Sequence, residues 1–209
     1  MKFSSNDISL LRTRVGELIS DKRYQHTLGV ERMAKMLGEV LMPDRVDELA
    51  VAALLHDVAK EISYEDQAAL LRASDDLYDA EELKLKPALH SIAAIPLIKS
   101  DFSDFATDDV LSAVANHTLG NDGMSVFDEI IFISDYAEEG RTYPTCVAAR
   151  AFLTENVKSV NSYEDNVIYL HKASLLSIDS TIESLVNRKE AIGERTFRTK
   201  KYLEDLISK

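Results

Sequence analysis

The chain has 209 residues, of which 45% are hydrophobic and 29% are charged, a balance typical of a folded protein with a buried core. Its formal net charge of −12 disfavours binding to nucleic acid or to an anionic membrane surface, because both of these carry negative charge. Only seven glycines and four prolines are available for turns. This scarcity disfavours an all-β sandwich or barrel, and the abundance of strong helix formers favours an all-α fold.

The cellular location is indicated by three features of the sequence. Cys146 is the only cysteine, so no disulfide can form within the chain and a reducing compartment fits. The first residues lack the basic start and apolar run of a secretory signal. No apolar stretch approaches the roughly 18 residues that a membrane-spanning helix needs. We therefore expect a cytoplasmic protein with no membrane partner.

Helical periodicity and capping residues predict helices along the whole chain, and no repeat or linker divides it. We expect a single domain over residues 1–209. The predicted helices cover residues 5–20, 22–41, 44–60, 65–72, 87–99, 108–117, 126–138, 145–160, 165–187 and 194–207. Pro87 lies at the first turn of its helix, where proline is accepted. Residues 73–86 are acidic and irregular, and we expect a lid or surface loop there.

A histidine and a carboxylate follow the most apolar predicted helix. Residues 49–55 are all small or apolar, so this helix is expected to be buried on nearly every side, and it ends in His56 and Asp57. A buried carboxylate needs a cation or hydrogen bonds to compensate its charge. Taken alone, the pair is explained equally well by a buried histidine–aspartate hydrogen bond or by a ligand site.

The other candidate ligands lie on different predicted helices. His26, His90 and His117 each belong to a separate helix, and Asp135 ends another apolar helical run. Each of them alone is explained by a helix cap, a surface position or a buried hydrogen bond. Imidazole is the commonest metal ligand, however, and helical bundles build metal sites from side chains on facing helices. Together these residues indicate a metal centre.

The order of these residues resembles a known superfamily. His26, the pair His56-Asp57 and Asp135 resemble the signature of the HD-domain metal-dependent phosphohydrolases, and His90 and His117 resemble the additional ligands of its dinuclear members. Four segments resemble the YqeK family: residues 23–27 (Arg-Tyr-Gln-His-Thr), 54–60 (Leu-Leu-His-Asp-Val-Ala-Lys), 116–118 (Asn-His-Thr) and 134–141 (Ser-Asp-Tyr-Ala-Glu-Glu-Gly-Arg). The motif-bearing core spans about residues 22–144.

The resemblance implies an HD-domain helical bundle with additional C-terminal helices, and an enzyme that cleaves diadenosine tetraphosphate symmetrically to two ADP through a hydroxide bound between two metal ions. It implies one ion held by His26, His56, Asp57 and Asp135. A second ion is implied at His90 and His117, with Asp57 bridging the two. This mixed nitrogen and oxygen ligand set suits iron, our first expectation, or manganese, cobalt or zinc.

Three basic residues are candidates for contact with the substrate. Asp57 and Lys60 are the expected catalytic residues, and Arg23, Lys60 and Arg141 the expected substrate-binding residues. Lys60 is equally well explained as a solvated helix end, and Arg23 and Arg141 as ordinary surface residues. The fifth histidine, His171, falls outside the pattern and is expected to be structural.

Some positions depart from the pattern that we expect of the YqeK family. Ser91-Ile92 replaces an expected Gly-Pro, Leu119 replaces an expected threonine, and Glu139 stands where a proline is common. None of these changes removes a candidate metal ligand. They leave open an HD phosphohydrolase that acts on another nucleotide, such as a nucleotidase or a guanosine-polyphosphate hydrolase. A non-catalytic sensor that binds metal and nucleotide is a further alternative. We expect a small nucleotide as the partner and a monomer or homodimer.

Overall fold

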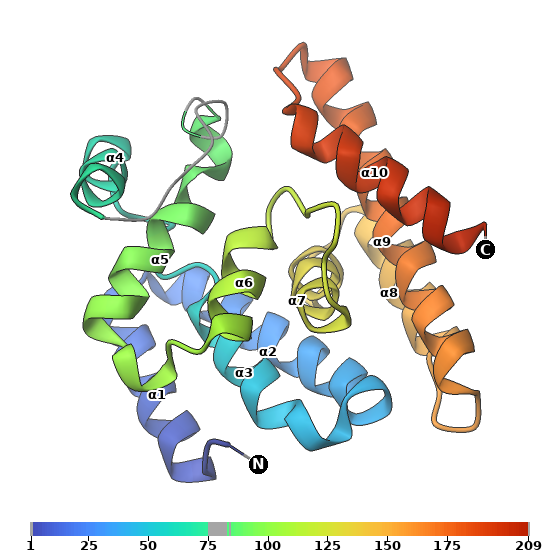
Figure 1. Ribbon diagram of the computed structural model, residues 1–209, viewed down its shortest axis with the longest axis horizontal. Helices are drawn as coiled ribbons and strands as arrows, with labels where there is room; N and C mark the ends of the chain where they lie inside the picture. Colours follow the sequence, from blue (N-terminus) through green and yellow to red (C-terminus); the bar gives the residue numbers. More distant parts are fainter. Residues whose placement is uncertain (1, 75–82, 84, 209) are drawn as a thin grey trace.

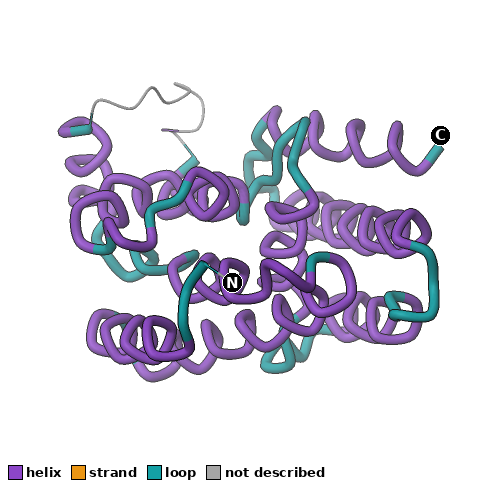
Figure 2. Tube along the Cα trace, turned by 60° about the horizontal axis from the view of Figure 1, so that its bottom comes forward, coloured by secondary structure: helices purple, strands orange, loops and turns teal. Residues whose placement is uncertain are grey.

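The computed structural model describes residues 2–74, 83 and 85–208, and these residues form helices and connecting loops without strands (Figure 2). The α-helices are α1 (Ser5–Leu18), α2 (Asp21–Leu41), α3 (Val46–Leu55), α4 (Tyr64–Ala73), α5 (Leu89–Asp101), α6 (Asp108–Asn116), α7 (Val126–Ala137), α8 (Pro144–Asn156), α9 (Tyr163–Arg188) and α10 (Glu194–Ile207). The all-α prediction is confirmed. The predicted lid falls largely on residues 75–82 and 84, which lie outside the described residues.

Most helices begin where a side-chain oxygen caps the first turn. Ser4, Ser20, Ser63, Thr107, Ser125 and Ser162 each accept a hydrogen bond from a backbone amide in the helix that follows. Short 3₁₀ helices, Pro43–Arg45 and Lys86–Ala88, precede α3 and α5. These capping residues explain why the predicted and observed starts of the helices agree closely.

The third predicted helix ends earlier than expected. It was predicted to continue to residue 60, but α3 ends at Leu55, and residues 56–62 form a tight turn. In this turn the amide of Lys60 donates to the carbonyl of Asp57 over 2.9 Å, an i to i+3 bond. The side-chain amide of Gln67 donates to the carbonyls of Ala59 and Ile62 over 3.1 and 2.8 Å, and so replaces bonds that a longer helix would have made.

Helix α3 forms the centre of the core. Residues 49–55 have no exposed surface, and α1, α2, α6 and α7 pack around them (Figure 1). This arrangement explains the lack of polar residues along α3. It also brings the C-terminal end of α3 close to α2, α6 and α7, the helices that carry or precede His26, His117 and Asp135.

The last three helices form a second group beside this core. Helix α9 packs against α7, α8 and α10, and Figure 1 shows the three C-terminal helices along one side of the molecule. His171 on α9 is buried, and its Nδ1 lies 2.8 Å from Oε2 of Glu129 on α7. This pair connects the two groups of helices and is consistent with the structural role predicted for His171. Among the described residues, no helix combines the length and apolar character needed to cross a membrane.

Candidate metal centre

The turn after α3 places His56 and Asp57 in the interior. His56 has no exposed surface and Asp57 is 3% exposed. The chain leaves the helix at this point, so the two adjacent side chains reach the same region from a compact turn. His90 enters from the start of α5, and His117 from the residue that follows α6.

Three of the histidines are oriented in the same way. The Nδ1 atoms of His56, His90 and His117 lie 2.6, 3.1 and 2.6 Å from the backbone carbonyl three residues earlier in the chain. A carbonyl oxygen only accepts, so Nδ1 carries the proton in each case. With the proton on Nδ1, the neutral form of each ring presents its lone pair at Nε2, the form in which imidazole binds a metal ion.

The carboxylate of Asp57 lies between two pairs of histidines. Its Oδ1 is 3.2 Å from Nε2 of His90 and 3.6 Å from Nε2 of His117. Its Oδ2 is 3.4 Å from Nε2 of His56 and 3.8 Å from Nε2 of His26. Each oxygen thus faces a different pair of rings, which is the arrangement expected of a carboxylate shared by two ions.

His26 on α2 joins the cluster through two carboxylates. Its Nε2 lies 3.0 Å from Oδ1 of Asp135, and its Nδ1 lies 3.1 Å from Oε1 of Glu138. Gly29, one turn further along α2, leaves room for Glu138, because a Cβ at this position would collide with the Glu138 carboxylate. A carboxylate on the second nitrogen of a ligand histidine fixes the ring and raises its basicity. Glu138 lies within the segment 134–141 that resembles the family, but no role was predicted for its side chain.

Several buried polar atoms of this cluster fit a metal ion. The Nε2 atoms of His26 and His56 and the Oδ1 atom of Asp57 make no hydrogen bond with any described residue. Such unsatisfied atoms are costly in a protein interior unless a ligand completes them. One group of possible ligand atoms comes from His26, His56 and Asp135, and a second from His56, Asp57 and His117, each within 4.8 Å of one another. The six predicted ligands thus lie together, although His90 belongs to neither of these two compact groups.

The protonation states of two candidate ligands, Asp57 and His90, also fit. Burial opposes ionisation of Asp57, but the neighbouring imidazoles of His56, His117 and His90 hold the pKa of Asp57 well below its usual range. Burial lowers the pKa of His90 to about 4, although the nearby carboxylate of Asp57 opposes this shift. At neutral pH, Asp57 is therefore ionised and His90 is neutral. Burial lowers the pKa of His26, but the nearby carboxylates of Asp135 and Glu138 outweigh it and raise this pKa to about 9. Metal binding must then displace a proton from His26.

The three predicted basic residues also lie at the cluster. Arg23 donates from Nη1 to Oδ2 of Asp57 over 2.8 Å, and Arg141 donates from Nη2 to Oδ1 of Asp135 over 2.8 Å. The Nζ of Lys60 lies 3.1 Å from Nε2 of His90. Burial lowers the pKa of Lys60, against the attraction of Asp57. All three are therefore part of the site and are not free surface residues.

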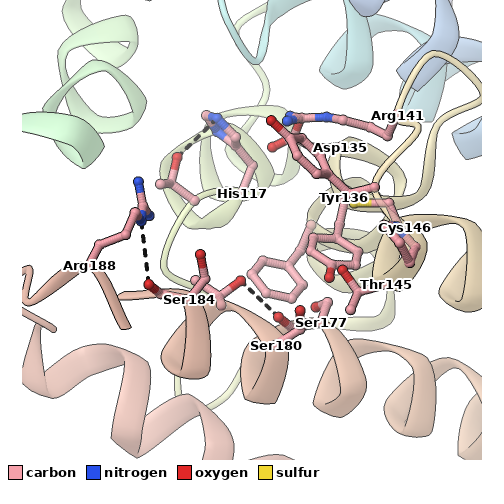
Figure 3. Close-up of a pocket in the computed structure, with 15 residues that line it drawn as sticks. His117, Asp135, Tyr136, Arg141, Thr145, Cys146, Ser177, Ser180, Ser184 and Arg188 are labelled. Carbon is pink, nitrogen blue, oxygen red and sulfur yellow. Dashed lines mark hydrogen bonds and ion pairs between the residues drawn. The ribbon is translucent and has the colours of Figure 1, made fainter. Parts of the chain in front are cut away.

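Two cavities open beside the cluster and share Arg141. One, of about 670 Å³, reaches His117, Asp135 and Arg141 (Figure 3). The other, of about 650 Å³, is lined by Arg23, His26 and Arg141. The first cavity also contains residues of α9 that the sequence interpretation missed: Ser177, Ser180, Thr181, Ser184 and Arg188. Their spacing along one helical face was the only sequence signal that they share.

Helix α10 holds the turn that follows His117. Arg195 donates from Nε to the carbonyl of Gly120 over 2.6 Å, and Thr199 donates from its hydroxyl to the carbonyl of Leu119 over 3.1 Å. Gly120 has a φ of +69°, and a Cβ there would collide with Thr199. This close contact fixes the backbone next to a candidate ligand.

Comparison with known proteins identifies the family. The chain is 28% identical over 185 residues to a protein of Halalkalibacterium halodurans named "Bis(5'-nucleosyl)-tetraphosphatase, symmetrical", which covers 87% of this chain and 88% of the relative. It is 26% identical over 190 residues to the Bacillus subtilis protein of the same name, covering 90% and 93% of the two chains. A crystal structure from Clostridium acetobutylicum, described as a "predicted HD superfamily hydrolase involved in NAD metabolism", superposes with a TM-score of 0.80. It is 26% identical to this chain, and the match covers 97% of this chain and 98% of that one.

The fold and the cluster agree with these similarities. The family model for the HD domain matches residues 23–140, a segment that contains every predicted ligand from His26 to Asp135. HD domains are associated with bound metal ions, and the buried histidine and aspartate side chains supply a suitable set of ligand atoms. The chain belongs to the HD-domain family of phosphohydrolases.

Proposed function

We propose that this protein is a metal-dependent phosphoric-anhydride hydrolase that cleaves diadenosine tetraphosphate symmetrically to two ADP. The observation that carries the proposal is Asp57, whose two carboxylate oxygens face separate pairs of histidines beside two cavities. This arrangement supports two ions that share one carboxylate. The names of the relatives from H. halodurans and B. subtilis support the substrate and the position of cleavage.

The proposed ligands form two sets, one on each side of the Asp57 carboxylate. His26, His56, Asp57 and Asp135 would hold one ion, and His90 and His117 would hold the second together with Asp57. Iron is the first expectation, with manganese, cobalt or zinc as alternatives. When bound, such ions polarise a phosphoryl oxygen and lower the pKa of a water molecule, which then becomes a nucleophile near neutral pH.

The residues of the chain have separate roles in this proposal. Glu138 holds the ring of His26 through its Nδ1, and the backbone carbonyls hold the other three rings with Nε2 turned inward. Arg141 lines both cavities and can contact phosphate oxygens on either side of the cleaved bond. Lys60 and Arg23 lie close enough to the ligands to contact the same phosphate chain once it is bound.

The reaction consumes one water molecule for each dinucleotide. The bond between the second and third phosphates breaks, the water oxygen adds to one of these phosphorus atoms, and two ADP molecules leave. Two cavities of similar volume on either side of Arg141 support a substrate with two similar halves. The aromatic bases would lie away from the ligands, and the phosphates would lie across them.

The products test this proposal directly. Protein purified with its metal and incubated with diadenosine tetraphosphate in oxygen-18 water is expected to release ADP alone, with the label in half of the ADP molecules. Chromatography with mass spectrometry separates ADP from ATP and AMP. Equimolar ATP and AMP would contradict symmetrical cleavage but would leave the metal centre intact. Asp57→Asn, which keeps the shape of the side chain but removes its charge, serves as the inactive control.

A second candidate is the same chemistry on another nucleotide. Leu119, which departs from the family pattern, lines a cavity beside the site, so the base that is recognised can differ from that of the relatives. Ser91 and Ile92 are buried at 2% and 5% exposure, so they affect the substrate only through packing. A panel of mononucleotides and guanosine polyphosphates distinguishes this candidate by faster turnover than with the dinucleotide. A sensor that binds without turnover would show no product from any of them.

A further inference from the structure

A third cavity adjoins the 670 Å³ cavity, and Arg141 is not among the residues that line it. Its volume is about 460 Å³, and its walls are formed largely by apolar side chains, including Leu85, Ala88, Leu119, Ile178 and Leu185. The two cavities share three lining residues, Thr118, Phe132 and Thr181, so they adjoin each other. The volume falls in the range of about 300–1,000 Å³ that is typical of small-molecule sites.

This apolar cavity opens close to the candidate ligands. The hydroxyl of Thr118, which lines both cavities, lies 3.1 Å from Nε2 of His117 and 3.2 Å from Nε2 of His90. A molecule with one end in the apolar cavity can therefore have its other end at these ligands. Thr118 marks the boundary between the apolar and the polar part of such a molecule.

The polar cavity beside it is suited to phosphate. Figure 3 shows Arg188 and Arg141 at opposite ends of this cavity, with His117 and Asp135 between them. Arg188 also pairs with Glu190 over 3.2 Å, and both side chains are substantially exposed. An exposed pair of this kind contributes little stability, so a phosphate can replace Glu190 as the partner of Arg188 at small cost.

The apolar cavity is suited to a different group. Few charged side chains line it, and the ammonium of one of them, Lys86, lies over the ring of Tyr64 at 4.5 Å. Phe132 offers an aromatic surface where the two cavities meet. Flat aromatic bases bind such surfaces by stacking and by exclusion of water. A base in the apolar cavity and phosphates in the polar cavity together describe a nucleotide.

We propose that the apolar cavity is a nucleoside subsite, which holds the base of a nucleotide while its phosphates extend past Thr118 toward His117 and Asp135. This proposal rests on the proposed function for the identity of the phosphates. Helices α9 and α10 lie outside the matched HD domain, yet α9 lines both cavities, with Ile178 and Leu185 in the apolar one, and α10 adds Thr196 to the apolar cavity. The C-terminal helices therefore select the nucleoside, and the HD domain performs the chemistry.

The test compares the binding of a probe that has a base with the binding of a probe that has only phosphorus groups. The variant Leu185→Asp places a charge in the half-buried wall of the apolar cavity. Leu176→Asp is the matched control, because Leu176 lies on the same helix, is 51% exposed and does not line the cavity. Calorimetry on the metal-loaded proteins measures two probes: ADP, and methylenediphosphonate, which carries two phosphorus groups and no nucleoside.

Leu185→Asp is expected to weaken the binding of ADP by about tenfold or more, equivalent to about 1.4 kcal/mol. The affinity for methylenediphosphonate is expected to stay unchanged. Leu176→Asp is expected to change neither. Ala191→Trp provides a second variant that does not depend on a buried charge, because Ala191 is an exposed loop residue at the cavity and the indole fills the space. It is expected to reproduce the selective loss of ADP if the fold is intact by circular dichroism.

Two results would overturn the subsite. One is an unchanged affinity for ADP in both Leu185→Asp and Ala191→Trp; the other is an equal loss of affinity for ADP and for methylenediphosphonate. The outcome for the proposed function is independent of these measurements. If ADP is weakened selectively but the wild-type protein cleaves no dinucleotide, the subsite stands and the proposed substrate is wrong. If the dinucleotide is cleaved symmetrically while both variants bind ADP normally, the base lies elsewhere and only the subsite is wrong.

Discussion

At the scale of single residues, Glu138 shows how a side chain can matter without contacting an ion itself. It is 3% exposed, lies 3.1 Å from Nδ1 of His26, and accepts a hydrogen bond from the amide of Gly140. Burial opposes its ionisation, but the hydrogen bond with His26 lowers the pKa of Glu138 below its usual value. The negative charge of Glu138 therefore remains available to orient the imidazole of His26.

We predict that Glu138→Gln weakens the metal centre without emptying it. Loss of the charge makes the His26 ring less basic and less firmly oriented, and changes of this kind reduce metal affinity about 10–100-fold. Competition with a chromogenic chelator measures this affinity. Glu139→Gln is the control, because the neighbouring Glu139 side chain is 66% exposed and forms an ion pair with the exposed side chain of Arg32. Equal affinity in both variants would contradict the role of Glu138.

Lys60 and Arg141 belong to the same scale, and we predict a different effect for them. Lys60→Ala and Arg141→Ala should keep their metal but lose about 1.5–3 kcal/mol of transition-state stabilisation, because each is proposed to make a charge-assisted contact with phosphate. Measurements of kcat/KM with elemental analysis of the same samples test this. Lys201→Ala, at a side chain that is 76% exposed on α10, is the control. An unchanged kcat/KM in both variants would remove these residues from the substrate site.

At the scale of helices, most of the architecture could be predicted from local sequence. Capping serines and apolar periodicity are local signals, and they located the helices to within a few residues in most cases. The end of α3 could not be predicted in this way, because the turn depends on Gln67, which lies in the next helix. The roles of Glu138 and Arg188 were missed for a related reason. Glu138 contacts His26 on α2, and Arg188 lines a cavity together with residues of other helices, so both depend on residues distant in the sequence. Local patterns do not contain such contacts.

The packing of the N-terminal segment on α3 leads to a prediction of pH dependence. The amides of Lys2 and Phe3 donate to Oδ2 of Asp47 over 2.5 and 2.6 Å. Burial opposes ionisation, but these hydrogen bonds outweigh it and lower the pKa of Asp47 below 3.8. A lowered pKa means that the ionised carboxylate stabilises the fold above pH 3.8, and that this stabilisation is lost as the pH falls through the pKa of the folded state.

We therefore expect Asp47→Asn to lower the free energy of unfolding by about 1.5–3 kcal/mol near neutral pH. The difference from the wild-type protein should shrink as the pH falls below 3.8, where the wild-type carboxyl also becomes neutral. Denaturant unfolding of metal-free protein at both pH values measures this difference. Asp44→Asn, at an exposed position just before α3, should show no such change. A difference that is constant with pH would exclude the carboxylate as its cause.

At the scale of the whole molecule, the metal centre joins helices from separate parts of the chain. Proposed ligands from α2, α5, α7 and the turns after α3 and α6 gather around one carboxylate, Asp57. In the protein itself, this carboxylate is compensated by histidines, by Arg23 and by the nearby Lys60. Bound metal should thus stabilise the entire fold, because binding to the native state alone shifts the unfolding equilibrium.

We predict that a chelator lowers Tm and that added metal restores it. At a free ion concentration about 100 times Kd, binding adds about 2.7 kcal/mol. For a chain of this length, that corresponds to a shift of roughly 5–10 °C. Asp57→Ala should show no shift with chelator, because it removes the carboxylate on which both proposed ions depend. A wild-type Tm that is insensitive to chelator and to added metal would contradict a stabilising metal centre.

The contact of α10 with the turn after His117 has a consequence for the order of events during protein synthesis. The ligand-bearing helices of the HD domain precede α10 in the chain, and they can form while it is still being translated. The backbone after His117 gains its contacts with Arg195 and Thr199 only when α10 has left the ribosome. We therefore expect the backbone next to the candidate ligand His117 to be held less firmly in the nascent HD domain until α10 has emerged.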